Sequence, residues 1–396
     1  MFMIPVPHGF SFAVAAAGLR YQDRNDLAVI YSDRPATAAG TFTTNLVQAA
    51  PVTICKEVLA DHETARAVLV NAGVANACTG EEGLLNAKLS IELAGDALGL
   101  SLDEILPAST GVIGMQMNMD CWRAAAPRLA DSLGKAGPME AAQAIRTTDA
   151  FPKTAWAEIE HNGAKARILG LAKGGGMIAP NMATLLGFIM TDAQVDVAWW
   201  RQALRSAVQD SFNRITVDGD TSTNDTILAL ANGAGDFKID TEPAKQALLE
   251  AMTEVCQGLA YMVAQDAEGG TKVAHIHVTG AASNHDAELA ARAVGTSPLV
   301  KTALFGQDPN WGRIVCAVGR SGATFDPDRL TLHFGKILVY REGRPVAGDL
   351  DGLLAPLMRL HDIDINISLG DGPGQATILG ADLGHEYVRI NGDYRT

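Results

Sequence analysis

The chain has 396 residues, a formal net charge of −14, 47% hydrophobic residues and 19% charged residues. This composition is ordinary for a folded globular protein and excludes a disordered chain. The negative charge, without any run of Lys or Arg, argues against nucleic acid or an anionic membrane surface as the main partner. The length indicates about two packed domains with ample core.

The chain is expected to be a cytoplasmic protein with reduced thiols. Its five cysteines are odd in number and contain no Cys-x-x-Cys pair, which argues against a disulfide framework or a zinc site. Residues Met1–Phe10 lack a basic stretch and contain two prolines, so they do not resemble a signal peptide. The longest apolar stretch, Met177–Met190, is too short to span a bilayer.

Helical periodicity is clearest in two segments of the first 280 residues. Leu84–Leu98 carries apolar residues at helical spacing and stops at Gly99, a residue suited to the position after a helix. Residues 241–264 predict a longer helix, because Thr241 can cap its start and Pro243 suits its first turn. Two further helices are predicted over 285–294 and near 351–360.

Strand-like runs alternate with these helices along the whole chain. They are Leu27–Tyr31, Ala67–Asn71, Thr226–Ala231, Lys272–Thr279, Arg313–Gly319 and Leu330–Tyr340. The alternation predicts an α/β protein. We expect a main catalytic domain over 1–280 and a smaller C-terminal α/β domain over 281–396.

Several common chemistries lack their motifs. No P-loop and no Gly-x-Ser-x-Gly elbow is present, and Gly233-Ala234-Gly235 lacks the third glycine of a dinucleotide fingerprint. His275 and His277 would share one face of a strand and could hold a metal, but no third ligand lies nearby in the sequence. A solvated strand face is the favoured interpretation, so neither a metal nor a cofactor is expected.

One segment, Lys173–Asp192, suggests a specific reaction. Three glycines and a proline form a loop without bulk, after which Thr184 opens an apolar run of strand length. Its hydroxyl could attack the preceding carbonyl, that of Ala183, and hydrolysis of the resulting ester would free Thr184 as a new N-terminus. The released α-amine could then activate the hydroxyl as a base. On this segment alone, an ordinary β-branched strand residue remains the favoured interpretation of Thr184.

Longer blocks reverse that preference, because they resemble the ornithine acetyltransferase family of arginine biosynthesis nearly from end to end. These blocks are Asp33–Ala36, Ala39–Asn45, Ala75–Gly80, Ala108–Gly114, Thr147–Asp149, Lys173–Asp192, Asn213–Thr226, Leu299–Ala303, Asp308–Arg313 and Tyr394–Thr396. Blocks of this length in one order are far more specific than a short motif. The resemblance implies a layered αββα sandwich, like that of this family and of the self-cleaving aminopeptidases.

The resemblance also implies the reaction and its residues. The chain would cut itself between Ala183 and Thr184, giving fragments 1–183 and 184–396. Thr184 would carry acetyl from N2-acetyl-L-ornithine to L-glutamate, with Thr110 and Gly111 as the oxyanion hole. The alternative for that pair is a glycine-rich turn. The substrate-contacting positions implied by the family are Thr147, Lys173, Thr184, Glu268, Asn391 and Thr396.

The resemblance further implies an α2β2 heterotetramer and leaves open whether acetyl-CoA is a second donor. Three departures from the family pattern are visible: Ala72 and Val74 replace polar residues, Arg146 replaces an apolar one, and Ala267 and Gly270 are exchanged around Glu268. The last departure puts the placement of Glu268 in question. The alternative function is a self-cleaving aminopeptidase or amidase of related architecture, which would release its acyl group to water.

Overall fold

The computed structural model describes residues 4–178 and 185–393 and contains two sheets. The first sheet has eight strands in the order β4-β3-β2-β9-β7-β6-β5, with β1 paired to β2. Its strands are β1 (Phe10–Ala15), β2 (Leu27–Phe42), β3 (Thr64–Val74), β4 (Ile105–Val112), β5 (Lys153–His161), β6 (Ala164–Lys173), β7 (Leu186–Thr191) and β9 (Thr226–Ala231). The helices around it are α1 (Ala50–Asp61), α2 (Gly80–Leu98), α3 (Met119–Ser132), α4 (Pro138–Ala144), α5 (Val197–Gln209) and α6 (Glu242–Gln265).

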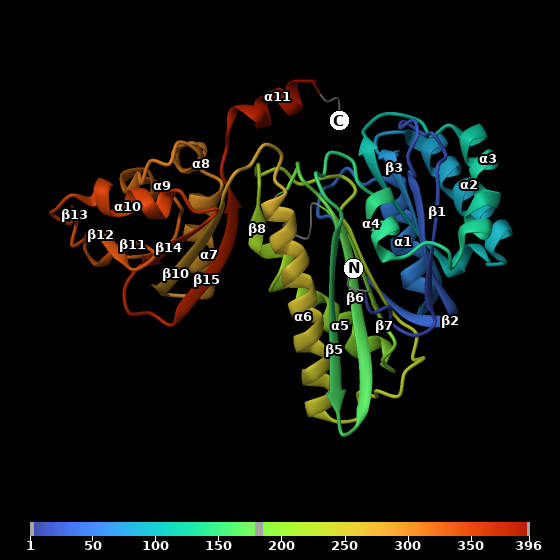
Figure 1. The fold of residues 1–396 in the computed structure, drawn as a ribbon. Helices are drawn as coiled ribbons and strands as arrows, with labels where there is room; N and C mark the ends of the chain where they lie inside the picture. The colour runs from blue at the N-terminus through green and yellow to red at the C-terminus, as the bar shows by residue number, and fades with distance from the viewer. Residues whose placement is uncertain (1–3, 179–184, 394–396) are drawn as a thin grey trace.

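The long strand β2 divides this sheet into two packed halves. The pairing register of β2 with β3 shifts between Tyr31 and Ala36; β1 pairs with β2 before this shift and β9 pairs with it afterwards. One buried cluster joins the two halves, with Ile30 and Val70 from one and Phe188 from the other. Helices α2 and α3 pack outside one half, and α5 and α6 outside the other (Figure 1). These layers confirm the predicted αββα sandwich.

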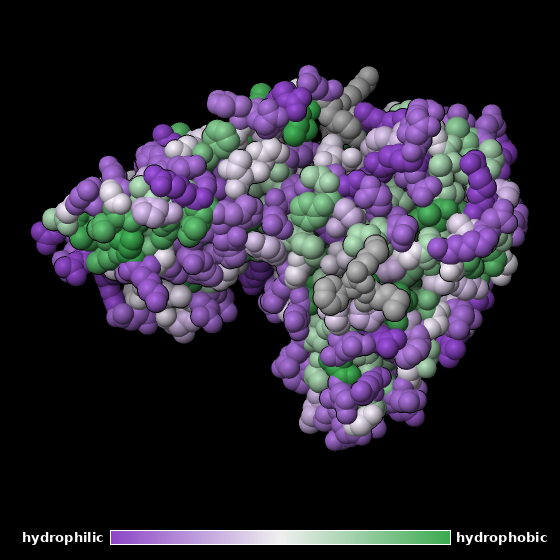
Figure 2. Space-filling view, in the orientation of Figure 1, coloured by the Kyte–Doolittle hydropathy of each residue, from purple (hydrophilic) through white to green (hydrophobic). Residues whose placement is uncertain are grey.

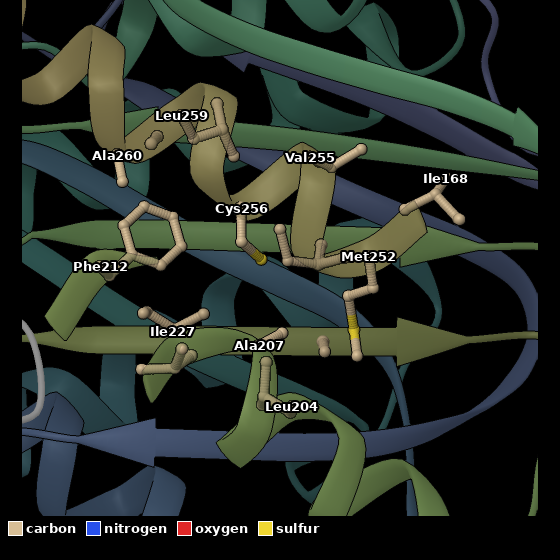
Figure 3. Close-up of a cluster of buried hydrophobic side chains, with 14 of the residues drawn as sticks. Ile168, Leu204, Ala207, Phe212, Ile227, Met252, Val255, Cys256, Leu259 and Ala260 are labelled. Carbon is tan, nitrogen blue, oxygen red and sulfur yellow. The ribbon is translucent and has the colours of Figure 1, made fainter. Parts of the chain in front are cut away.

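Helix α6 covers the outer face of the half that contains β5, β6, β7 and β9 (Figure 3). Its start confirms the sequence prediction, because the Thr241 hydroxyl accepts a hydrogen bond from the backbone N–H of Ala244. Val255, Cys256 and Leu259 face the sheet and are buried. The helix ends at Gln265, just before the Asp266–Thr271 turn that reaches the candidate site.

The second sheet has seven strands in the order β13-β12-β11-β14-β10-β15-β8. They are β8 (Ile215–Thr216), β10 (Val273–Ala281), β11 (Thr331–Phe334), β12 (Ile337–Arg341), β13 (Arg344–Pro345), β14 (Asp362–Ser368) and β15 (Gly374–Ala381). The helices of this part are α7 (Asn284–Gly295), α8 (Pro298–Phe305), α9 (Trp311–Gly319), α10 (Leu350–Met358) and α11 (His385–Asp393). Three 3-10 turns complete the described elements: Leu102–Glu104, Phe212–Arg214 and Pro327–Arg329.

Strand β8 lies within the expected 1–280 domain, and β10 lies within it except for its last residue, Ala281; both pair with C-terminal strands. The division at residue 280 stays a prediction. The second sheet contains strands from both sides of that division. Helix α11 then leads the chain from the second sheet back toward the first (Figure 1). Hydrophobic residues gather on the far end of the second sheet, over β11, β12 and α10, while most of the visible surface is hydrophilic (Figure 2).

One predicted strand is wrong. Residues 313–319 form most of helix α9, whose first turn is capped where the Asn310 side chain accepts from the N–H of Arg313 at 3.2 Å. Ile314, Ala317 and Val318 are buried on one face at helical spacing. A short apolar run cannot be assigned by pattern alone. The predicted run Leu330–Tyr340 is a hairpin, β11 and β12, with Gly335 at a φ of +55° in its turn.

Candidate active site

A cavity of about 220 Å³ opens where the ends of β4 and β6 meet the start of β7 and helix α11. Six of the positions predicted from the sequence lie on its wall, and they come from five separate parts of the chain: Thr110, Gly111, Thr147, Lys173, Glu268 and Asn391. Ala183, Thr184 and Thr396 lie outside the described residues. Leu185, the next residue along the chain from Thr184, also lines the cavity. The roles of these residues stay predictions.

Lys173 occupies the end of β6 and is only 8% exposed. Its Nζ donates hydrogen bonds to the Thr147 hydroxyl at 2.8 Å and to the Thr110 hydroxyl at 3.3 Å. The same Nζ lies 3.7 Å from the Asp149 carboxylate. One ammonium therefore holds two of the predicted site hydroxyls in fixed positions, because an ammonium carries three donors and no acceptor.

Behind Lys173 lies a buried network of charges. The Asp149 carboxylate accepts from Lys153 Nζ at 2.8 Å and from the N–H groups of Gly174 and Thr147 at 2.7 and 3.0 Å. Lys153 Nζ also donates to Asp266 at 2.5 Å. Burial raises the pKa of the Asp149 carboxyl, but the ammonium groups of Lys173 and Lys153 outweigh burial and hold that pKa well below its usual range. Burial raises the pKa of Asp266.

Sequence reasoning did not identify Lys153 or Asp266. Lys153 begins β5 and Asp266 follows α6, so their contact depends on two elements packing together. Asp149 stood within a resembling block but received no role. The only local sign of such a buried charge is a charged side chain next to apolar neighbours in the sequence. This sign is weak, because most lysine side chains extend their ammonium group to water.

Gly111 occupies a position where no other residue fits. Its φ is +134°, and a Cβ there would lie 2.1 Å from the carbonyl carbon of Gly73 on the paired strand β3. Nearby, the Asn224 side-chain amide donates to the carbonyls of Ala75 and Ser109 at 2.6 and 2.9 Å. This amide ties together the ends of β3 and β4, and with them the Thr110–Gly111 pair.

Glu268 lies against the glycine loop that follows Lys173. Its N–H donates to the carbonyl of Gly175 at 2.9 Å, and its carboxylate accepts from the Asn391 amide at 2.8 Å. A Cβ on Gly176 would lie 2.3 Å from a Glu268 oxygen, so a larger residue there would displace the carboxylate. Helix α11 thus reaches back from the second sheet to contact a residue of the cavity wall.

Two of the departures from the family pattern, at Ala267 with Gly270 and at Arg146, leave this arrangement intact. Glu268 lines the cavity despite the exchange of Ala267 and Gly270, whose turn is closed by a hydrogen bond from Gly270 N–H to the Ala267 carbonyl at 2.8 Å. Arg146 donates to the backbone carbonyl of Asp149 at 3.2 Å. A polar side chain at position 146 therefore contacts the residue that carries the buried charge network.

Through its carboxylate, Asp218 binds the backbone at Met177 and Ile178, in the segment between Lys173 and Thr184. Its carboxylate accepts from the N–H groups of Met177 and Ile178 at 2.6 and 2.8 Å, and from the Tyr387 hydroxyl at 3.2 Å. Met177 has a φ of +57°, which is unusual for a residue with a side chain. Burial, together with the negative charge of Asp218, raises the pKa of Tyr387 above its ordinary value. Sequence reasoning quoted Asp218 within a block but assigned it no role.

Outside the cavity, one group among the described residues has the residue types and spacing of metal ligands. It consists of His275, His277 and Asp364 on the second sheet. Within the same described ranges, no helix combines the length and apolar character needed to cross a bilayer.

The chain is similar over nearly its whole length to proteins of known name. The ArgJ family profile matches residues 11–396. The arginine biosynthesis bifunctional protein ArgJ of Nitratidesulfovibrio vulgaris is 50% identical over 98% of this chain and 99% of its own length. The protein of the same name from Synechocystis is 46% identical over 99% of this chain and 98% of its own.

A solved structure gives the same result. The crystal structure of arginine biosynthesis bifunctional protein ArgJ from Bacillus halodurans is 38% identical, with a TM-score of 0.50 over 52% of this chain and 98% of that one. The matched blocks, the αββα layers and the extent of these similarities agree with the resemblance seen in the sequence. The chain belongs to the ArgJ family.

Proposed function

We propose that this protein transfers an acetyl group from N2-acetyl-L-ornithine to L-glutamate through an ester on Thr184. The Thr184 hydroxyl attacks the acetyl carbonyl, the carbon–nitrogen bond breaks, and ornithine leaves with its α-amine protonated. The α-amine of glutamate then attacks the ester, the carbon–oxygen bond breaks, and Thr184 regains its proton. Membership in the ArgJ family and the arginine-biosynthesis names of its relatives support this reaction.

The observation that carries the proposal is the placement of Lys173 between Thr110 and Thr147 in a cavity that Leu185 also lines. Leu185 directly follows the proposed nucleophile, Thr184, in the sequence. Thr110 Oγ and the N–H of Gly111 would stabilise the oxyanion of each tetrahedral intermediate. The Lys173 ammonium, which lies 3.7 Å from the Asp149 carboxylate, would fix the Thr110 hydroxyl.

The charges of the cavity suit amino-acid substrates. Both proposed substrates carry an α-carboxylate, and ornithine also carries a side-chain ammonium. We assign the carboxylate to Lys173 and the ammonium to Glu268, because ionised partners form the stronger hydrogen bonds. Asn391 holds the Glu268 carboxylate at 2.8 Å and would keep it oriented toward the donor. Thr147 and Thr396 would complete the substrate contacts.

Self-cleavage before Thr184 would produce fragments 1–183 and 184–396. The order of the first sheet supports their continued association. Strands β9 and β7, from the second fragment, lie between β2 and β6, which both come from the first. Separating the fragments would break two strand interfaces and expose buried residues on both, such as Phe188 and Leu171. We further propose an α2β2 assembly that works in the cytoplasm.

An assay with purified protein tests the proposal. N-acetylornithine and glutamate together should give N-acetylglutamate and ornithine, whereas the alternative function, an aminopeptidase or amidase, would release free acetate. A parallel reaction replaces N-acetylornithine with acetyl-CoA, because the relatives are named bifunctional. Thr184→Ala should stay one chain and lose activity. Release of acetate without transfer to glutamate would overturn the proposal.

A further inference from the structure

Between Ala274 and Val278, strand β10 of the second sheet has one apolar and one polar face. On β10, Ala274, Ile276 and Val278 are buried in a cluster with helix α7. His275 and His277 alternate with them and point to the opposite face. On the neighbouring strand β14, Asp362 and Asp364 alternate in the same way with buried isoleucines. Strands β10 and β14 are neighbours in the second sheet (Figure 1). The two histidines and the two aspartates therefore share one polar face.

The parallel register of β10 and β14 brings a third ligand beside the histidine pair. His275 is the register partner of Asp364, and His277 Nε2 lies 3.7 Å from an Asp364 oxygen. One ligand atom from each of His275, His277 and Asp364 lies within 4.8 Å of the other two. In a tetrahedral zinc site, the ligand atoms lie about 3.3 Å from one another. His275 and His277 are partly exposed and Asp364 is exposed, so rotation of these side chains can shorten the distances between the three atoms.

The outer partners of both histidines suit metal binding. His275 Nε2 lies 2.7 Å from Asp362 Oδ1, and His277 Nδ1 lies 3.0 Å from the Thr377 hydroxyl. When each of these nitrogens carries the proton, the other nitrogen of each ring keeps its lone pair. Metal-binding histidines usually donate their second ring N–H to an oxygen partner such as a carboxylate, as His275 can to Asp362. The two rings already lie stacked, with centroids 6.3 Å apart.

Asp362 is itself held by groups from other parts of the chain. Its oxygens accept from the Tyr261 hydroxyl at 3.0 Å and contact His361 Nδ1 at 3.0 Å. Tyr261 belongs to helix α6, so this carboxylate joins α6 to the second sheet. A cation bound to His275 and His277 would strengthen this connection, because it would lie beside Asp362, which contacts both Tyr261 of α6 and His275 of the second sheet.

We propose that His275, His277 and Asp364 bind one divalent transition-metal ion of the zinc class, with Asp362 orienting His275. Two imidazoles and one carboxylate match the donors that this class prefers, and Ca²⁺ or Mg²⁺ would favour oxygen donors alone. The ion strengthens the connection between α6 and the second sheet. The site is separate from the cavity that contains Lys173.

Zinc titration of the full, chelator-treated protein tests this site by calorimetry and by melting temperature. We expect one saturable equivalent of Zn²⁺ and a higher melting temperature with zinc, since the ion binds the folded state. His277→Ala should abolish the saturable binding. Asp362→Asn should weaken it about 10- to 100-fold, as changes in second-shell partners do. Co²⁺ should give visible absorption bands that disappear in His277→Ala.

His333→Ala is the matched control. His333 lies on β11 opposite Asn366 of β14, on the same sheet but outside the proposed ligand set. This variant should bind zinc as the parent protein does. Equal weakening in His333→Ala and His277→Ala, or no saturable binding by the parent protein, would overturn the proposal. The melting temperatures of the variants without metal verify that each is folded.

Discussion

Lys153 Nζ and Asp149 Oδ1 lie 2.8 Å apart, and neither side chain is exposed to solvent. The same Asp149 carboxylate lies 3.7 Å from Lys173 Nζ, the ammonium on the cavity wall. A fully buried ion pair thus supports the residue that contacts Thr110 and Thr147. Because a buried charge without a partner is costly, each member of this network constrains the others.

Asp149→Asn should strongly destabilise the protein, because the buried Lys173 ammonium then faces a neutral amide, while Lys153 keeps Asp266 as a charged partner. Removing one partner of a buried pair costs about 3–5 kcal/mol in the free energy of unfolding. Denaturant unfolding measures this difference. Asp120→Asn is the control, since Asp120 pairs with Arg123 while 91% exposed and such pairs contribute about 0–1 kcal/mol. Similar losses in the two variants would contradict the account.

Lys301 predicts a pH dependence of stability. Its Nζ donates to the carbonyls of Val217 at 2.6 Å and of Ala381, and burial lowers its pKa to about 8 from the ordinary lysine value of 10.5. Between these values the unfolded chain binds more protons than the folded one, so the free energy of unfolding should rise with pH.

Lys301→Met removes this dependence while keeping an unbranched side chain. The stability difference between the parent protein and the variant should grow by up to about 3 kcal/mol from about pH 7 to about pH 11, in favour of the parent. Urea unfolding across this range measures it. A constant difference would show that the pKa of Lys301 is the same in the folded and the unfolded chain.

Gly111→Ala should prevent folding or maturation, because the added Cβ would meet the Gly73 backbone at 2.1 Å. Gly114→Ala is the matched control: Gly114 also has a positive φ, +78°, but nothing lies within 4 Å of the position of its Cβ. We expect Gly114→Ala to cost about 1–2 kcal/mol, the ordinary penalty for a left-handed residue with a Cβ. Soluble yield and melting temperature distinguish the two, and equal behaviour would exclude the close approach as the cause.

Glu268→Gln should lower kcat/KM for N-acetylornithine while sparing self-cleavage, which needs no substrate. Hydrogen bonds to charged groups contribute about 1.5–3 kcal/mol, equivalent to about 10- to 150-fold. Glu386→Gln is the control on helix α11, because Glu386 is exposed, pairs with Arg389 and lies outside the cavity lining. Normal use of N-acetylornithine by Glu268→Gln would remove Glu268 from the donor site, whereas failure to cleave would assign it to maturation.

Capping residues in the sequence predicted the ends of two helices. Thr241 marks the start of α6, and Gly99, with a φ of +69°, marks the end of α2. The prediction for Arg313–Gly319 was wrong because its β-branched residues favour strands. In the structure this segment is a helix, which begins at the Asn310 cap and buries Ile314. Intrinsic preference was weaker there than tertiary packing.

In the candidate site, too, some features could be predicted from the sequence and others could not. The resemblance placed Lys173, Glu268 and four other residues that the fold gathers around one cavity. The contacts that hold them, such as Lys153 with Asp266, join segments 113 residues apart and leave no pattern in a single sequence. Asp364 beside His277 is a further case, since the parallel register of β10 and β14 cannot be read from either strand alone.

The account depends most on an acetyl group resting on Thr184 between the two half-reactions. Intact-mass measurement after incubation with N-acetylornithine, without glutamate, tests this directly. We expect two fragments, 1–183 unmodified and 184–396 carrying one acetyl group that glutamate removes. A fully active preparation that contains only the uncut chain, or one in which neither fragment is acetylated, would contradict the account.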